Sequence, residues 1–157
     1  MTEDNAYQFW GGFEHAVDDK GRVIIPQEFR EALGEEFVVT RGPDKAILVL
    51  PMPLWQQIQN KLKSAVFQQQ AHLLQRLLGL RSIVRLDPQS RLAIPKLLRD
   101  WAGITQSETA VIVGEGSKLE IFSKKSWDLY SDAQFNYSTL YDAAEAIGLA
   151  EVVERNA

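Results

Sequence analysis

An internal repeat constrains the fold of this chain more than any other feature of its sequence. Residues 17–34, VDDKGRVIIPQEFREALG, align with residues 86–103, LDPQSRLAIPKLLRDWAG, at a separation of 69 positions. The identical pairs in this stretch are Asp18/Asp87, Arg22/Arg91, Ile25/Ile94, Pro26/Pro95, Arg30/Arg99 and Gly34/Gly103. At a separation of 72 the match continues with Val39/Val111, Gly42/Gly114, Ile47/Leu119, Val49/Ile121 and Trp55/Trp127. The chain is therefore predicted to contain two copies of one supersecondary unit.

The signals within each copy predict the order strand, turn, strand, short helix, strand, tight turn and strand. The turns DDKG and DPQS interrupt short aliphatic runs that are typical of strands. Pro26 and Pro95 fit the first position of a helix, and Gly34 and Gly103 fit its left-handed end. Two further pairs of apolar runs flank turn residues and predict a hairpin in each copy. With four strands in each copy, the two copies are expected to share one barrel.

Amphipathic helices are expected between the copies and after the second one. Leu54, Ile58 and Leu62 recur at four-residue steps, and the apolar pattern that follows ends near Gly79. This spacing predicts two helices. The chain is divided into a first repeat (9–60), a linking helical segment (61–80), a second repeat (81–130) and a C-terminal helical tail (131–157). The expected fold class is α+β, mainly β with short peripheral helices.

The composition excludes several kinds of site. The chain has no cysteine, and its two histidines, His15 and His72, are far apart in the sequence. Disulfides and thiolate metal sites are therefore excluded, and no metal or cofactor is expected. The first residues lack the basic start and apolar run of a signal peptide, and no run of about 18 apolar residues occurs. These features predict a cytoplasmic protein.

The charge is unevenly distributed along the chain. The net charge of −4 is unfavourable for binding a polyanion. However, residues 61–99 carry eight Lys or Arg against one Asp, whereas residues 1–60 and 100–157 each carry ten Asp or Glu against five and four basic residues. A basic middle segment therefore lies between acidic flanks. This pattern is compatible with a solvated helix surface or with a nucleic-acid interface.

The repeated motif resembles the MraZ family of AbrB-like (SpoVT-AbrB) regulators. The first copy carries Phe9-x-Gly11-x-x-x-His15-x-Val17-Asp18-x-Lys20-Gly21-Arg22, followed by Pro26 and Arg30. The second carries Leu86-Asp87-x-x-x-Arg91, followed by Pro95 and Arg99. The resemblance covers roughly residues 9 to 128. It implies a pseudo-dimeric, swapped-hairpin β-barrel in which the second copy supplies the partner that related half-barrels find in another chain.

The resemblance also implies a function. Members of this family regulate transcription of a cell-division and cell-wall gene cluster, and they bind direct repeats in a promoter as a ring-like homo-oligomer. The chain is accordingly expected to bind double-stranded DNA and to be associated with the nucleoid. No membrane or small-molecule substrate is expected.

The residues expected to contact DNA are Lys20, Arg22, Arg85 and Arg91. An arginine in the D-x-x-x-R turn can form two hydrogen bonds to guanine O6 and N7 or to a phosphate. Lys20 would act as a point charge on the DNA backbone, and Gly21 would let the turn approach closely. Asp18 and Asp87 are expected to orient the arginines. Because Ser90 replaces the glycine of the first motif, the first copy is predicted to be the main reader.

Other interpretations of these residues remain open. The Asp18–Arg22 and Asp87–Arg91 pairs are also compatible with intramolecular ion pairs that only stabilise turns, a role worth roughly 0–1 kcal/mol when exposed. Arg30 and Arg99 are expected to cover apolar surface with their side-chain stems. Trp55, Trp127, Leu73 and Leu77 fit a core or a subunit interface.

The sequence also bears on two other functional classes. Related barrels include a decarboxylase that cleaves itself at a Gly-Ser bond, and Gly116-Ser117 is such a dipeptide, but no His, Cys or paired carboxylates accompany it by motif. The chain is therefore expected not to be an enzyme. The alternative is a non-catalytic barrel for protein-protein assembly or for antitoxin-like partner binding.

Overall fold

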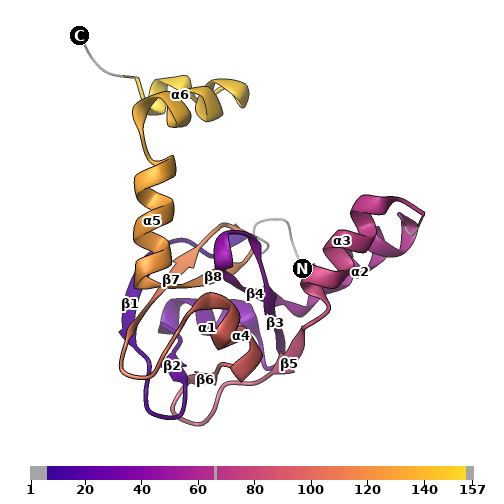
Figure 1. Ribbon diagram of the computed structural model, residues 1–157, viewed down its shortest axis with the longest axis vertical. Helices are drawn as coiled ribbons and strands as arrows, with labels where there is room; N and C mark the ends of the chain where they lie inside the picture. The colour runs from indigo at the N-terminus through magenta and orange to yellow at the C-terminus, as the bar shows by residue number, and fades with distance from the viewer. Residues whose placement is uncertain (1–6, 66, 155–157) are drawn as a thin grey trace.

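The computed structural model describes residues 7–65 and 67–154, and it contains two successive sets of the same elements (Figure 1). The first set comprises β1 (Gly12–Ala16), β2 (Arg22–Ile24), α1 (Gln27–Leu33), β3 (Phe37–Arg41), the 3₁₀ turn η2 (Pro43–Lys45), β4 (Ile47–Pro51), α2 (Met52–Ser64) and α3 (Gln69–Leu78). The second comprises β5 (Ser82–Val84), β6 (Arg91–Ala93), α4 (Lys96–Ala102), β7 (Thr109–Gly114), β8 (Leu119–Ser123), α5 (Lys124–Gln134), α6 (Tyr137–Ala146) and η3 (Ala150–Val152). The predicted order of strands and helices within a copy is confirmed. Residues 1–6, which belong to the segment without signal-peptide features, and residues 155–157 of the predicted helical tail lie outside the described residues.

The two copies exchange strands within one six-stranded sheet, whose order is β1-β7-β8-β4-β3-β5. Strand β1 of the first copy pairs with β7 of the second, and β5 of the second pairs with β3 of the first. Strands β4 and β8 pair at the centre, where Val49 lies opposite Leu119 and Ile47 opposite Ile121. Neither copy could complete this sheet without the other.

A second, two-stranded sheet is formed by β2 and β6, one strand from each copy. Val23 and Leu92 lie opposite each other in this pair and are almost fully buried. Both belong to the main core, which draws equally on the two copies. Its other large members include Ile25, Phe29, Phe37, Ile47, Ile94, Leu98, Ile112, Leu119 and Ile121.

Helices α1 and α4 begin one residue later than the sequence predicts and end where it predicts. Pro26 and Pro95 directly precede them, with φ angles of −54° and −55° that suit a helix start. Gly34 and Gly103 follow them with φ angles of 77° and 67°, which favour glycine. Phe29 and Leu98 occupy the same position in the two helices and are fully buried. The repeat is therefore preserved in helix ends as well as in the core.

The helical pairs that close the two copies are arranged differently. Helices α2 and α3 lie side by side as a hairpin against the large sheet, with Trp55 and Leu78 packed on Leu48 and Leu50. The end of α3 is fixed by a hydrogen bond from Thr40 Oγ1 to the Leu78 carbonyl (2.8 Å).

In the second copy, α5 packs on β7 and β8, whereas α6 packs chiefly against η3 and extends away from the sheets (Figure 1). The sequence Leu78-Gly79-Leu80 at the end of α3 recurs as Ile147-Gly148-Leu149 at the end of α6, again 69 positions later. Leu78 is 8% exposed, but Ile147 is 72% exposed. The second copy therefore repeats the helical pair but packs only its first helix, α5, on the sheet.

The expected fold class is confirmed: the molecule is mainly β, with short helices, and consists of two interlocked repeats. In the described part of the chain, β1 and β5 are edge strands with one neighbour each, so the strands share a core without closing into a hydrogen-bonded barrel. None of the described helices is both long and apolar enough to cross a membrane.

Candidate nucleic-acid interface

The first D-x-x-x-R motif forms a tight turn between β1 and β2, organised by the Asp18 carboxylate. Asp18 Oδ1 accepts hydrogen bonds from the backbone N–H groups of Lys20 (2.9 Å) and Arg22 (2.8 Å). The Asp18 carbonyl accepts one from the N–H of Gly21 (3.1 Å), which has a φ of 74°. An aspartate that bonds the backbone ahead of it is the usual way of fixing such a turn. Lys20 is left exposed at its tip.

The same carboxylate holds the arginine of the motif. Arg22 Nε donates to Asp18 Oδ2 (2.7 Å), and the Arg22 side chain is 24% exposed. The two terminal nitrogens of Arg22 donate to no described residue. The backbone N–H of Arg22, followed by its side chain and the N–H of Lys20, outweighs desolvation and lowers the pKa of Asp18. Asp18 therefore stays ionised and orients a guanidinium whose outer edge is available.

The second motif reproduces this turn between β5 and β6. Asp87 Oδ1 accepts from the N–H groups of Gln89 and Arg91 (2.9 Å each), and Asp87 Oδ2 accepts from Arg91 Nε (2.8 Å). Desolvation opposes ionisation of Asp87, but the hydrogen bonds from Arg91 and Gln89 outweigh it and lower the pKa. Ser90 occupies the position of Gly21 with a φ of 63°. Unlike Arg22, Arg91 also uses Nη2, which donates to Gln89 Oε1 (3.1 Å).

The two arginines share the outer face of the β2–β6 sheet, which we call the arginine ribbon (residues 22–24 and 91–93). Arg22 lies opposite Ala93, and Arg91 lies opposite Ile24. Since Val23 and Leu92 point into the core, alternation places these four side chains on the outside. The turns touch across the ribbon, with Arg91 Nη1 4.0 Å from Asp18 Oδ2. The pairing of β2 with β6 therefore brings the two predicted motifs together.

Ile24 and Ala93 are members of this face that sequence reasoning missed. Ile24 is 44% exposed, although it belongs to an apolar run that reads as core. The available signal was the two-residue period of a strand, which places residue 24 on the same face as Arg22 and residue 93 on the same face as Arg91.

Arg30 and Arg99 were expected to cover apolar surface with their side-chain stems. In the structure they also support the arginine ribbon through hydrogen bonds. Their Nε atoms donate to the carbonyls of Ile25 (2.9 Å) and Ile94 (3.1 Å), at the ends of the two strands. A Cβ added to Gly21 would lie 2.7 Å from the guanidinium of Arg99. A side chain at position 21 would therefore displace the Arg99 guanidinium, while the φ of 74° is the stricter reason for a glycine there.

Arg85 lies directly after β5 and is 62% exposed. Its partners are Glu36 Oε1 (2.7 Å) and Glu35 Oε2 (4.0 Å), in the segment between α1 and β3. These partners belong to neither motif turn. The contact of Arg85 with DNA stays a prediction.

The Gly116-Ser117 dipeptide lies in the turn between β7 and β8. Gly116 is buried and exchanges two backbone hydrogen bonds with Phe9 (3.0 and 2.7 Å), so this turn closes against the N-terminal segment. Within residues 7–65 and 67–154, no group of three or more His, Cys, Asp or Glu side chains is arranged to hold a metal ion.

Comparison with known proteins adds a family to this geometry. The family model described as "MraZ protein, putative antitoxin-like" matches the chain twice, at residues 9–77 and 80–148. A protein named transcriptional regulator MraZ from Natranaerobius thermophilus is 40% identical over 124 residues, covering 78% of this chain and 85% of its own. Proteins of the same name from Desulforamulus reducens and Syntrophomonas wolfei are 38% and 35% identical, covering 78% and 90% of this chain and 87% and 99% of their own. The second family match extends through α5 and α6.

Proposed function

The chain belongs to the MraZ family, and from that premise we propose that it is a transcriptional regulator that binds double-stranded DNA through the arginine ribbon. The observation that carries the proposal is the presentation of Arg22 and Arg91 on one outward face, each held by an aspartate of its own motif. The names of the relatives support the regulatory role.

The geometry suits the major groove of DNA. The groove admits a two-stranded β-ribbon, and arginine is the side chain that most often reads guanine there. Asp18 bonds Nε of Arg22, which leaves Nη1 and Nη2 to bond O6 and N7 of guanine or two phosphate oxygens. A guanidinium already oriented loses less side-chain entropy on binding.

The remaining predicted residues have supporting roles in the proposal. Lys20, exposed at the tip of the first turn, would contact a phosphate, and Gly21 would allow the turn to approach. Asp87 orients Arg91 as Asp18 orients Arg22. Arg85 would add positive charge beside the second turn. The first copy is the proposed main reader, since the second turn has Gln89 in place of Lys20.

The protein is proposed to act as a homo-oligomer on direct repeats in a promoter, that of a cell-division and cell-wall gene cluster by family resemblance. A single arginine ribbon neutralises few phosphates, and the net charge of the chain is −4. One molecule alone would therefore bind DNA weakly. Several ribbons on tandem sites would raise affinity through effective concentration. This role implies a cytoplasmic, nucleoid-associated protein without catalytic activity.

The test is the binding of a labelled duplex from upstream of the chain's own gene, measured by fluorescence anisotropy at several salt concentrations. Affinity should fall steeply with added salt, and Arg22→Ala should weaken binding by about 1–3 kcal/mol, roughly 5- to 150-fold. Lys125→Ala, which removes an exposed charge from α5, is the matched control and should change little. Unchanged affinity and salt dependence in Arg22→Ala would refute the assignment of Arg22.

Two other outcomes would redirect the proposal. Salt-independent failure to bind the duplex, together with capture of a partner protein, would favour the protein-assembly or antitoxin-like alternative. An intact mass showing two fragments divided between Gly116 and Ser117 would overturn the non-enzymatic assignment.

A further inference from the structure

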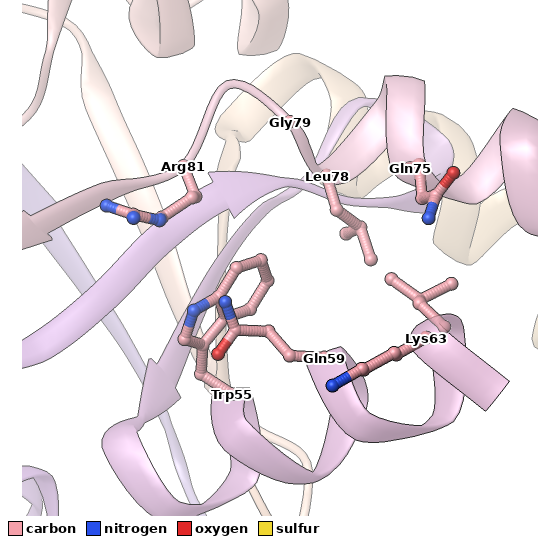
Figure 2. A pocket seen from close by; sticks show the side chains of 8 residues that line it. Trp55, Gln59, Lys63, Gln75, Leu78, Gly79 and Arg81 are labelled. Carbon is pink, nitrogen blue, oxygen red and sulfur yellow. The ribbon is translucent and has the colours of Figure 1, made fainter. Parts of the chain in front are cut away.

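The hairpin of α2 and α3 contains an apolar groove. Trp55, Leu62 and Leu78 form its floor, and Figure 2 shows Trp55 and Leu78 projecting into the space between the helices. Lys63 and Arg81 stand at its margins, and the hollow has a volume of about 670 Å³. The groove can therefore accept an apolar segment, provided that the flanking charge of that segment is negative.

The C-terminal segment (residues 137–154, α6 and η3) exposes several large apolar side chains and makes few contacts with the sheets. Its exposed apolar side chains include Tyr137, Ile147, Leu149 and Val152, with Ile147 and Val152 more than 70% exposed. In the described structure α6 packs chiefly against η3. Such a surface is costly unless it is covered in the working protein.

The segment cannot occupy the place on its own repeat that α3 occupies on the first. In the first copy, α3 packs over Leu48 and Trp55. At the matching place in the second copy, Glu120 stands in the position of Leu48, and Glu115 and Asp44 line the same hollow. Phe135, directly after α5, already lines this hollow and packs against Trp127, with ring centroids 5.9 Å apart.

The groove and the segment have opposite charges. Residues 52–81 contain no acidic side chain, and their basic ones are Lys61, Lys63, Arg76 and Arg81. Residues 137–154 contain no basic side chain, and their acidic ones are Asp142, Glu145, Glu151 and Glu154. Complementary patches of this kind select and orient a partner.

Within one molecule the two surfaces lie on different sides of the sheets, because the α2–α3 hairpin and the α5–α6 arm project in different directions (Figure 1). A contact between the groove and the segment must therefore be made between two molecules of the protein. Joining two different surfaces gives a head-to-tail interface, which closes into a ring if the rotation allows.

We propose that the C-terminal segment of one molecule docks into the α2–α3 groove of the next molecule in the oligomer. Ile147, Leu149 and Val152 would fill the hollow lined by Leu62 and by the remaining exposed edges of Trp55 and Leu78. Glu151 and Glu154 would face Lys63 and Arg81. The inference rests on the homo-oligomer of the proposed function and names the surfaces that build it.

The test is charge reversal on each surface, read by native mass spectrometry and sedimentation velocity without DNA. The groove variant is Lys63→Glu with Arg81→Glu, and the segment variant is Glu151→Lys with Glu154→Lys. All four side chains are exposed, so both variants should fold, which circular dichroism would verify. Each variant alone should lose the assembled mass.

Mixing the two variants should restore it, because the reversed segment then meets the reversed groove and the two unaltered surfaces meet each other. A wild-type chain that is monomeric at all concentrations would overturn the homo-oligomer itself. A wild-type oligomer whose mass survives both variants, or a mixture that does not reassemble, would overturn only the docking, with duplex binding measured separately.

Discussion

The two motif turns are nearly superimposable in their hydrogen bonds, whereas the two helical pairs differ. The turns keep one geometry although Lys20-Gly21 in the first corresponds to Gln89-Ser90 in the second, because the aspartate and the arginine make the bonds. The helical pairs share their sequence pattern, yet both helices of the first pair pack on the large sheet, whereas in the second pair only α5 does so. The geometry of each turn is thus determined by two side chains close in the sequence. The docking of a helix depends on the side chains of the sheet on which it packs.

The difference between the helical pairs centres on two neighbouring positions of the large sheet. Leu48 of β4 and Glu120 of β8 are equivalent in the repeat and lie directly opposite each other in the strand pairing. Leu48 is covered by the α2–α3 hairpin. Burial, a hydrogen bond with Glu115 and the repulsion of that carboxylate raise the pKa of Glu120 to about 8. The same repeat position therefore holds Leu48 in an apolar contact in the first copy, and in the second copy Glu120 in a hydrogen bond with Glu115.

Leu48→Glu should have the largest effect, because it gives the first copy the residue of the second. Leu48 is 7% exposed, so the variant places a carboxylate beneath α2 and opposite Glu120. The free energy of unfolding should fall by roughly 2–4 kcal/mol, measured by urea denaturation at low protein concentration. Leu48→Gln is the control that separates charge from polarity. A loss below about 1 kcal/mol would show that docking of the first helical pair does not depend on this position.

Arg22→Ala and Arg91→Ala compare the two readers directly. Arg22 should be worth about 1–3 kcal/mol of duplex binding and Arg91 distinctly less, because Arg91 Nη2 is already bonded to Gln89 and its turn lacks a lysine. Anisotropy titrations at one salt concentration would measure both. Equal losses would mean that the copies read DNA symmetrically and would remove the proposed inequality.

Gly21→Ser and Ser90→Gly exchange the turn residues of the two copies. Gly21→Ser should cost about 1–2 kcal/mol of stability, because it places a side chain at a φ of 74° and within 2.7 Å of Arg99. Ser90→Gly should stabilise by at most about 1 kcal/mol, since relief at a φ of 63° is offset by the freedom gained in the unfolded chain. Thermal unfolding would measure both changes. Equal and opposite shifts would argue against a role for Arg99.

Glu120→Gln should have the smallest effect, visible only as a dependence on pH. Between its ordinary pKa of 4.5 and its folded pKa of about 8, Glu120 holds a proton in the folded chain that the unfolded chain has released. Stability contributed by this group therefore falls as pH rises through that window. The glutamine variant should match the wild type near pH 4.5 and exceed it by an amount on the order of 1 kcal/mol above pH 8, given the partial exposure of the site. A constant difference at every pH would contradict the assigned proton.

The repeat made much of the fold predictable, because both copies carry the same turn, proline and glycine signals. The motif turns and the ends of α1 and α4 follow from Asp18, Pro26, Gly34 and their counterparts, whereas the exchange of strands was expected from the family resemblance alone. The undocked α6 could not be predicted, since its own apolar pattern resembles that of α3. In the structure α6 packs chiefly against η3, a tertiary arrangement that its own residues do not specify.

The candidate site was predictable to a similar extent. Asp18 and Arg22 could be paired from their spacing, but the outward position of Ile24 depends on β2 pairing with β6 of the other copy. The carbonyl contacts of Arg30 and Arg99 likewise require the strand ends to be in place. The sequence therefore identified the residues of the site, but not the contacts that they make in the folded chain.

The exchange of strands has a consequence for synthesis on the ribosome. Gly12 of β1 pairs with Val113 of β7, about a hundred residues later, so the first strand stays without its partner until most of the chain has emerged. Pairings of such long range fold slowly and expose strand edges in the meantime. A nascent first copy resembles a free half-domain, and during translation it is open to pairing with the first copy on a neighbouring ribosome.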